Sequence, residues 1–323
     1  MSGTQGVHSP HSKPVDPHLS DPVNVLPPDL TPDSKSRIAL RGVGSKDVLI
    51  PYLSIGAWSW ADKATFNYNP TRDLPRIHAA WAKLKSVGLT FVDTAQSYGD
   101  GESERICGTL FRDMPCDSFV AGEPKAKLKD SLLRLNLDYV DIYLVHGPIH
   151  PSKISTVANG MPDCVESEMM RAVGVANYDT TEMIKIADEL AKHDVPLSVC
   201  QCEYSVVRRS PEVSGMIREC RKRSICFQGF SSLAEGRGSY PMHILEPTIN
   251  VLKSIAEGQH VPVPAVALNY SINKGVLPLV GVRDASQAEQ DMLAFGWRLT
   301  EDEMEQIGEV SLEGSRSPFM QHG

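Results

Sequence analysis

The feature that most constrains the fold is a repeated alternation of short apolar runs with longer amphipathic segments. Eight apolar runs have the length and composition of buried strands. They lie at residues 52–56, 89–93, 118–121, 140–146, 172–176, 198–203, 225–230 and 277–280. Helical periodicity is found at 73–87, 103–112, 127–135, 180–193, 211–222, 246–257 and 286–295, and a last helix is expected at 301–310. Eight strand-helix units predict an α/β fold, a closed (β/α)8 TIM barrel rather than an open sheet.

The ends of the chain and one internal unit are expected to depart from this alternation. Residues 1–36 are rich in Pro, Ser, Asp and His, which predicts a flexible, disordered N-terminal tail. The alternating segment 36–50 predicts a β-hairpin ahead of the barrel. Gly160 and Pro162 interrupt the fourth unit, so a short or broken helix is expected at about 163–170. Residues 37–323 are then expected to form a single barrel domain.

Composition restricts the partners of the chain. The 323 residues are 41% hydrophobic and carry a net charge of −8, which disfavours nucleic acid and anionic membranes as general partners. No apolar run has the length of a membrane span, and the N-terminus lacks the features of a signal peptide. Seven cysteines without zinc-finger spacing favour a reduced, cytoplasmic protein and no metal site.

One loop between a strand and a helix carries chemically useful side chains. Asp93 ends the apolar run 89–93, and Tyr98 follows five positions later, before a Gly-Asp-Gly turn. Ser103 is expected to cap the next helix. Loops of this type hold the active sites of parallel α/β folds. The alternative is that Asp93 caps a turn and Tyr98 packs. For Trp58 and Trp60, walling a pocket and packing under a loop remain equally open.

The loop also resembles a known signature. Asp-Thr-Ala-x-x-Tyr-Gly-x-Gly-x-Ser-Glu, beginning at Asp93, is similar to the signature of the aldo-keto reductases, particularly the fungal and plant branch that includes pyridoxal-reductase-like proteins. Further stretches agree in the order of the family: Ser131-Leu132-Leu133-Arg134-Leu135, Asp138 to His146, Val173-Gly174-Val175-Ala176-Asn177-Tyr178, Gln201-Cys202-Glu203-Tyr204-Ser205 and Pro278-Leu279-Val280-Gly281. The resemblance covers roughly residues 38 to 312.

The resemblance implies an NADPH-dependent oxidoreductase that reduces an aldehyde or ketone to an alcohol. It implies that Tyr98 donates the proton, that Asp93 orients the local charge network and that His146 helps to position the carbonyl. No Gly-x-Gly-x-x-Gly opens a helix after the first strand, so a dinucleotide would lie across the barrel mouth instead. A satisfied structural histidine is the alternative interpretation of His146.

The resemblance also implies a set of cofactor-binding residues. Two of them match carboxamide-binding positions, Phe230 replaces an aromatic that stacks on the nicotinamide, and the others match the phosphate and adenine side. The set is Asn177, Gln201, Phe230, Ser231, Leu233, Gly236, Arg283, Gln287 and Asp291. Arg283 falls where the family holds the 2′-phosphate, which favours NADPH over NADH because a guanidinium makes paired charge-assisted hydrogen bonds. A solvated loop arginine is the alternative.

One catalytic position departs from the family pattern. Glu123 stands where the family has a lysine, and a carboxylate there would raise the pKa of the Tyr98 phenol. Lys125 and Lys127 are candidate replacements, or ordinary surface lysines at the start of a helix. The segment after Glu123 and that after residues 236–238 are shorter than in relatives. Either the chain has diverged from ordinary reduction or the gene model lacks coding segments.

Three functions therefore compete: a carbonyl reductase acting on a small molecule, an NADPH-binding barrel with weak turnover that acts as a sensor or partner subunit, and a structural barrel without cofactor. Asp93, Tyr98 and His146 favour the first, and Glu123 favours the second. The sequence leaves the substrate, the direction of the reaction and the oligomeric state open.

Overall fold

A computed structural model describes residues 26, 30–112, 118–121, 125–147, 153–234 and 241–314, with the backbone alone for Ser45 and for 118–121. Eight parallel strands close into a barrel in the order β10-β3-β4-β5-β6-β7-β8-β9. The predicted barrel class is confirmed. The expected disorder of residues 1–36 falls largely outside the described residues.

The barrel strands are short, as buried parallel strands usually are. Their bounds are β3 Ser54–Gly56, β4 Val92–Ala95, β5 Ser118–Ala121, β6 Val140–His146, β7 Met170–Ala176, β8 Leu197–Glu203, β9 Cys226–Phe230 and β10 Leu277–Gly281. Pairing of β10 with both β3 and β9 closes the ring. All eight carboxyl ends therefore open at one mouth.

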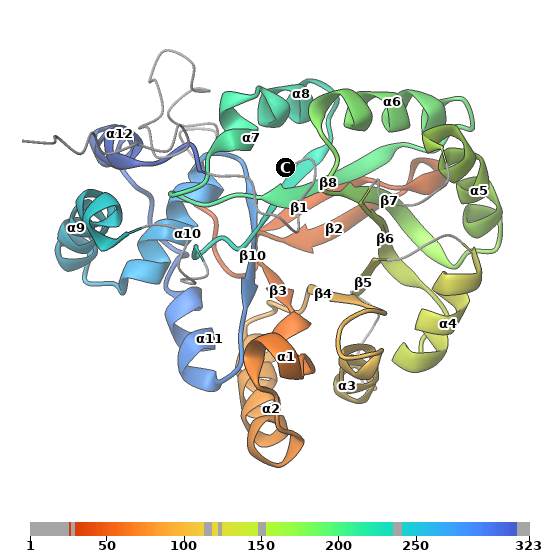
Figure 1. Ribbon diagram of the computed structural model, residues 1–323, viewed down its shortest axis with the longest axis horizontal. Coiled ribbons are helices and arrows are strands. Elements are labelled where there is room, and N and C mark those ends of the chain that lie inside the picture. The colour runs from red at the N-terminus through yellow and green to blue at the C-terminus, as the bar shows by residue number, and fades with distance from the viewer. Residues whose placement is uncertain are drawn as a thin grey trace, which may run out of the picture.

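Helices form a layer outside the strands (Figure 1). Their bounds are η3 Trp58–Trp60, α1 Lys63–Phe66, α2 Pro70–Ser86, α3 Glu102–Leu110, α4 Lys125–Leu135, α5 Ile154–Glu166, α6 Thr180–Ala191, α7 Ser210–Val213, α8 Met216–Lys222, α9 Met242–Gln259, α10 Val263–Asn273, α11 Ala285–Met292 and α12 Glu301–Val310. Capping boxes start α6, at Asp179 with Glu182, and α12, at Thr300 with Glu303. No helix in the described ranges is long and apolar enough to cross a membrane.

The predicted hairpin is confirmed and packs against the barrel interior. It consists of β1 Arg37–Arg41 and β2 Asp47–Pro51, joined by η2 Val43–Ser45. Apolar side chains of the hairpin form one cluster with residues that point into the barrel: Leu40, Val48, Ile50, Phe91, Ala95, Ile142, Leu144, Ala172, Ala176, Val199 and Leu277. A second and larger cluster fills the layer between the strands and the helices.

The fourth helix differs from the prediction. The chain forms one continuous helix, α5, with Gly160 and Pro162 inside it, and β7 begins at Met170. A proline lacks one helical hydrogen bond, but α5 buries the side chains of Val157, Met161 and others against the barrel. This burial compensates for the lost bond, so the prediction of a short or broken helix at about 163–170 is wrong.

Two further boundaries were also wrong. The segment expected as one helix at 211–222 is divided into α7 and α8 by Gly215, whose φ of 78° lies in the left-handed region. Helix α10 was not predicted at all, because nine of its residues are buried on all sides and it shows no polar face. Periodicity finds a helix only where one face is exposed.

A fully buried ion cluster joins the last helix to the barrel. The guanidinium of Arg209 donates to both carboxylate oxygens of Glu212, at 2.7 and 2.6 Å, and Lys274 Nζ lies 2.9 Å from Oε1. Arg209 also bonds to Ser311, just after α12. Burial alone would raise the pKa of Glu212, but Arg209 and Lys274 hold it below its ordinary value. The carboxylate therefore stays charged.

Replacement of Glu212 tests how much this cluster contributes to the free energy of unfolding. Glu212→Gln leaves two buried cations without their carboxylate, so we expect the free energy of unfolding to fall by about 3–5 kcal/mol. The matched control is Glu219→Gln on α8, where the carboxylate pairs with Arg223 at the surface and little change is expected. Urea denaturation of both variants measures the effect. Equal midpoints would contradict a stabilising role for the cluster.

Candidate active site

Hydrogen bonds tie the loop after β4 to the neighbouring strand and helix. The hydroxyl of Ser103 donates to the carbonyl of Ala57, at 2.9 Å, and lies 2.9 Å from the hydroxyl of Thr94. Ser103 therefore does not cap α3 as expected; the N-cap is Gly101, with a φ of 80°. The Thr and Ser of the sequence motif thus hold β3, β4 and α3 together.

The Glu and Gly of the same motif have structural tasks as well. Glu104 is fully buried and forms an ion pair with Arg134 of α4, which also donates to Ser131. Gly99 has a φ of 56°, and a Cβ there would lie 2.6 Å from the Cβ of Ala61. Only glycine allows this close approach. The loop that presents Tyr98 is therefore fixed on both sides.

Tyr98 lies between two aromatic rings at the barrel mouth. The His146 ring, at the end of β6, is perpendicular to it with centroids 6.4 Å apart. The Trp58 ring stacks on its other side with centroids 6.1 Å apart. Trp60 is instead buried, and its indole N–H donates to the carbonyl of Val282. Of the two tryptophans, Trp58 borders the mouth and Trp60 packs.

Asp93 is a buried carboxylate without a cation. It is 3% exposed, and Nε2 of Gln201 donates to its Oδ2 at 2.8 Å. Within the described ranges, no lysine or arginine forms an ion pair with it. Burial raises the pKa of Asp93 to about 7, although the bond from Gln201 opposes this rise. Asp93 can therefore hold or release a proton near neutral pH.

His146 is neutral at physiological pH. Its side chain reaches solvent at the mouth, but the protein around the ring excludes much of the water that would stabilise a charge. This desolvation lowers the pKa of His146 below its ordinary value. A neutral imidazole can donate one hydrogen bond to a carbonyl oxygen and accept another.

The candidate replacement lysines lie outside the mouth. Lys125 Nζ lies 3.4 Å from Asp163 of α5, in the outer helical layer, and is exposed. Lys127 is exposed on the first turn of α4. Both positions agree with surface lysines at a helix start. Glu123 itself lies outside the described residues, so its effect on Tyr98 stays a prediction.

The two predicted carboxamide-binding residues are adjacent. The backbone N–H of Asn177, after β7, donates to the carbonyl of Gln201 at 2.8 Å. Asn177 has a φ of 62°, which lies in the left-handed region, and its Oδ1 is buried without a hydrogen-bond partner. A buried acceptor of this kind costs free energy unless a ligand provides a donor.

A cavity of about 260 Å³ lies next to the mouth and contains most of the predicted phosphate-side residues. Its lining includes four residues of the predicted cofactor set, Ser231, Leu233, Arg283 and Gln287, together with Ser59, Phe66, Ser232, Leu279, Val280 and Gly281. The Ser59 hydroxyl is buried without a partner. Phe230 ends β9 immediately before this lining. Gly236 lies outside the described residues.

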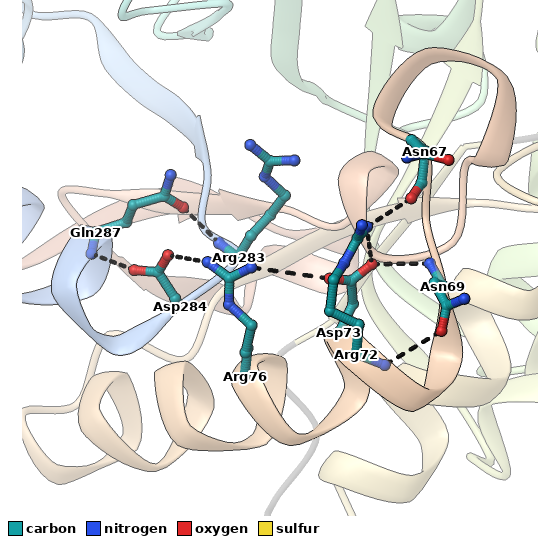
Figure 2. A network of polar contacts seen from close by, with 8 residues as sticks. All are labelled: Asn67, Asn69, Arg72, Asp73, Arg76, Arg283, Asp284 and Gln287. Carbon is teal, nitrogen blue, oxygen red and sulfur yellow. Dashed lines mark hydrogen bonds and ion pairs between the residues drawn. The ribbon is translucent and has the colours of Figure 1, made fainter.

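Arg283 differs from its arginine neighbours in having no carboxylate partner among the described residues. Figure 2 shows Arg72 and Arg76 engaged with Asp73 and Asp284, whereas the Arg283 guanidinium points away from this network. The backbone N–H of Arg283 donates to the side chain of Gln287, and its guanidinium lies 5.7 Å from the ring of Phe66. Phe66 was missed because the short helix α1 has no periodicity to reveal it.

These residues fit a phosphorylated nicotinamide dinucleotide. Arg283 offers a phosphate a cation that has no carboxylate partner in the described ranges, and the Ser59 hydroxyl, also without a partner there, offers a further hydrogen bond. At the mouth, the oxygen of Asn177 has no described partner and could accept from a donor such as a carboxamide. Gln201, Asn177 and Phe230 would hold the nicotinamide end, and Arg283 with Ser59 the phosphate end.

Asp291 is not where an adenine contact would be expected. It faces inward from α11, is 2% exposed and is absent from the cavity lining. Its Oδ2 has no hydrogen-bond partner, and burial raises its pKa to about 7. The family pattern has Asn at this position. Because the Asp291 carboxyl is buried, it costs stability whenever it is ionised.

Whether ionisation of Asp291 lowers the stability of the protein can be tested by changing the pH. Between about pH 4 and 7 the native Asp291 binds a proton that the unfolded chain has lost, so stability falls as the pH rises. Asp291→Asn should therefore stabilise the protein by about 2–4 kcal/mol at pH 8 and very little near pH 4. Thermal unfolding across this range measures it.

Asp284, the N-cap of the same helix, is the control of opposite sign. The backbone N–H of Gln287, with Arg76, holds its pKa below the ordinary value. Asp284→Asn should therefore destabilise more at pH 8 than at low pH. A pH-independent effect of Asp291→Asn would contradict the assigned protonation of Asp291.

Two curated proteins of similar sequence are named reductases. The chain is 27% identical over 308 residues to the chloroplastic pyridoxal reductase of Arabidopsis thaliana, with 82% of this chain and 84% of that protein covered. It is 23% identical over 336 residues to an L-glyceraldehyde 3-phosphate reductase of Escherichia coli O157:H7, with 88% and 95% covered.

Solved structures agree with the fold. The thermostable aldo-keto reductase Tm1743 superimposes with a TM-score of 0.74 at 24% identity, covering 85% of this chain and all of that one. An aldo/keto reductase from Klebsiella pneumoniae, solved with NADP and acetate, gives a TM-score of 0.70 at 22% identity and covers 89% and 100%. Residues 52–312 match the model of the aldo/keto reductase family. The chain therefore belongs to the aldo/keto reductase family of oxidoreductases.

Proposed function

We propose that this protein is an NADPH-dependent reductase that converts an aldehyde or ketone into an alcohol at the barrel mouth. The observation that carries the proposal is the placement of Tyr98, between His146 and Trp58, at the same mouth as the partnerless acceptor of Asn177. The names of the relatives are consistent with it, since pyridoxal and glyceraldehyde 3-phosphate are both aldehydes.

Each side chain has a task that follows from its surroundings. When bound, NADPH supplies the hydride. Neutral His146 donates a hydrogen bond to the carbonyl oxygen of the substrate and so orients it. Tyr98 gives its phenolic proton to the same oxygen as negative charge develops there. Trp58 stacks on the Tyr98 ring and so helps to hold it at the mouth.

The electrostatic role of Asp93 in this chain differs from that of an aspartate that is paired with a lysine and stays ionised. With its pKa near 7 and Gln201 as its partner, it is protonated in a large fraction of molecules at neutral pH. A protonated Asp93 adds no negative charge near Tyr98, so the phenol keeps its acidity. This arrangement partly offsets the lack of a family lysine.

The second candidate function is an NADPH-binding barrel with weak turnover that acts as a sensor or partner subunit. The outward ion pair of Lys125 with Asp163 favours it, because that lysine is engaged away from the mouth. Cofactor binding would be retained under this function and catalysis would be slow. The two functions are separated by turnover, measured with saturating NADPH and a panel of simple aldehydes.

Cofactor choice depends on Arg283. We expect NADPH to bind at least ~10-fold more tightly than NADH, because only NADPH brings a 2′-phosphate to the unpaired guanidinium. Arg283→Ala should abolish this preference, whereas Arg76→Ala, which removes a guanidinium already paired with Asp284, should keep it. Fluorescence titration gives the Kd for NADPH and for NADH in the unmodified protein and in the two variants. Equal affinities in the unmodified protein would refute the assignment.

The proton donor is tested by removal of one hydroxyl. Tyr98→Phe should lower kcat by about 10²–10⁴-fold and leave the Kd for NADPH nearly unchanged, because the hydroxyl acts on the substrate. Tyr139→Phe, which removes a phenol bonded to Arg171 at the outer surface, is the control. A normal kcat in the Tyr98→Phe variant would mean that another group donates. Turnover that is negligible before any substitution would favour the sensor function.

A further inference from the structure

A chain of hydrogen bonds crosses the barrel interior and leads away from Asp93. Gln201 Nε2 lies 2.8 Å from Oδ2 of Asp93 and 3.0 Å from Oε1 of Gln228. Gln228 Nε2 lies 2.7 Å from Oγ of Ser54, and this Oγ lies 2.9 Å from the carbonyl oxygen of Pro278. The four side chains are 0–6% exposed and come from β4, β8, β9 and β3. Water therefore has little access to the chain.

The far end of this chain fixes its direction. The carbonyl of Pro278 can only accept, so the single hydrogen of the Ser54 hydroxyl is donated to it. The Ser54 oxygen is then an acceptor, and it receives a hydrogen from the amide nitrogen of Gln228. The amide oxygen of Gln228 consequently faces Gln201. Gln201 must present its nitrogen there, and its second amide hydrogen goes to Asp93.

This direction determines what Gln201 offers to a ligand. With both amide hydrogens engaged, its Oε1 is the polar atom left, and no described residue donates to that oxygen. Oδ1 of the adjacent Asn177 is likewise an acceptor without a partner. These two side-chain oxygens therefore favour a ligand that presents N–H groups. A carboxamide nitrogen carries two hydrogens and is such a donor.

We propose that Ser54 and Gln228 are positioning residues that hold the Gln201 amide with its oxygen toward the barrel mouth, so that the site selects a nicotinamide ring by the N–H donors of its carboxamide. The inference rests on the proposed function, because it takes NADP(H) as the ligand of the mouth. If the Gln201 amide were inverted, its N–H groups would face the N–H groups of the nicotinamide carboxamide, and the hydrogen bond between Gln201 and the ligand would be lost.

A purely structural role gives a different expectation. Buried polar groups are normally paired, and this chain would stabilise the barrel even if it oriented nothing. Its loss would then lower stability or weaken all dinucleotides equally. Orientation of Gln201 instead predicts a change in the ratio between two dinucleotides that differ only in the donor on the ring.

The two probes are NADP⁺ and its 3-acetylpyridine analogue, which keeps the carbonyl oxygen and replaces the amide nitrogen with a methyl group. Protein fluorescence gives the Kd of each, without any turnover. We expect the unmodified protein to favour NADP⁺ about 10-fold, the worth of one well-made hydrogen bond. Ser54→Ala frees the Gln228 amide to turn over, and the ratio should fall to about 2-fold.

Conservative variants distinguish orientation from packing. Ser54→Thr keeps the hydroxyl and should keep the ratio. Gln228→Glu, neutral when buried, retains a carbonyl for Gln201 and a donor for Ser54 and should also keep it, whereas Gln228→Met has no strong acceptor and should lose it. Ser198→Ala is the matched control, because it removes a buried hydroxyl bonded to Arg41 at the other end of β8.

Each outcome is decisive. A ratio that falls in Ser54→Ala and Gln228→Met but persists in Ser54→Thr and Ser198→Ala supports the proposal. Tight NADP⁺ binding with an unchanged ratio in Ser54→Ala and Gln228→Met overturns it and leaves the proposed function intact. Equal affinity of the unmodified protein for both probes also overturns it, even if every variant fails to fold. If neither probe binds, the proposed function and this inference are refuted together.

Discussion

Closure of eight parallel strands into a ring is the constraint on which the other features depend. Closure brings all strand carboxyl ends to one mouth, so Asp93, His146 and Gln201 meet although they are far apart in sequence. It also creates an interior that apolar side chains must fill and in which buried polar groups need hydrogen-bond partners. Apolar side chains of the hairpin and strands fill one part of it, and the hydrogen-bonded chain from Asp93 to Ser54 satisfies the other.

Much of this arrangement could be predicted from sequence, because strand length and the position of motif residues are local properties. The barrel, the hairpin and the strands that carry Asp93 and His146 are of this kind, although β4 begins at Val92 and continues past Asp93 to Ala95. What escaped prediction depends on tertiary burial. Helix α10 has no exposed face, α5 retains Pro162 because the barrel buries its apolar side, and Gln228 acquires meaning only through its partners on other strands. Ser103 bonds across to β3 instead of capping α3.

The five buried carboxyl groups among the described residues divide into two kinds. Glu104, Asp141 and Glu212 form ion pairs with arginine or lysine, which suits groups that hold elements together. Asp93 and Asp291 have no cation in the described part of the chain, and burial raises the pKa of each to about 7. Such isolation costs stability and is tolerated mainly where a group must exchange protons. This is consistent with the catalytic role proposed for Asp93, whereas nothing in the described surroundings of Asp291 explains its carboxyl.

The buried ion cluster also bears on how the chain folds as it is synthesised. Arg209 and Glu212 emerge from the ribosome together, Lys274 follows 62 residues after Glu212, and Ser311 follows 102 residues after Arg209. A nascent chain that has made β8 and α7 therefore holds a charge pair that its own later helices must still enclose. All three charges are present once Lys274 has been made, but Arg209 gains its bond to Ser311 only when the C-terminal helix has docked, so completion of the chain is a condition for a sealed core.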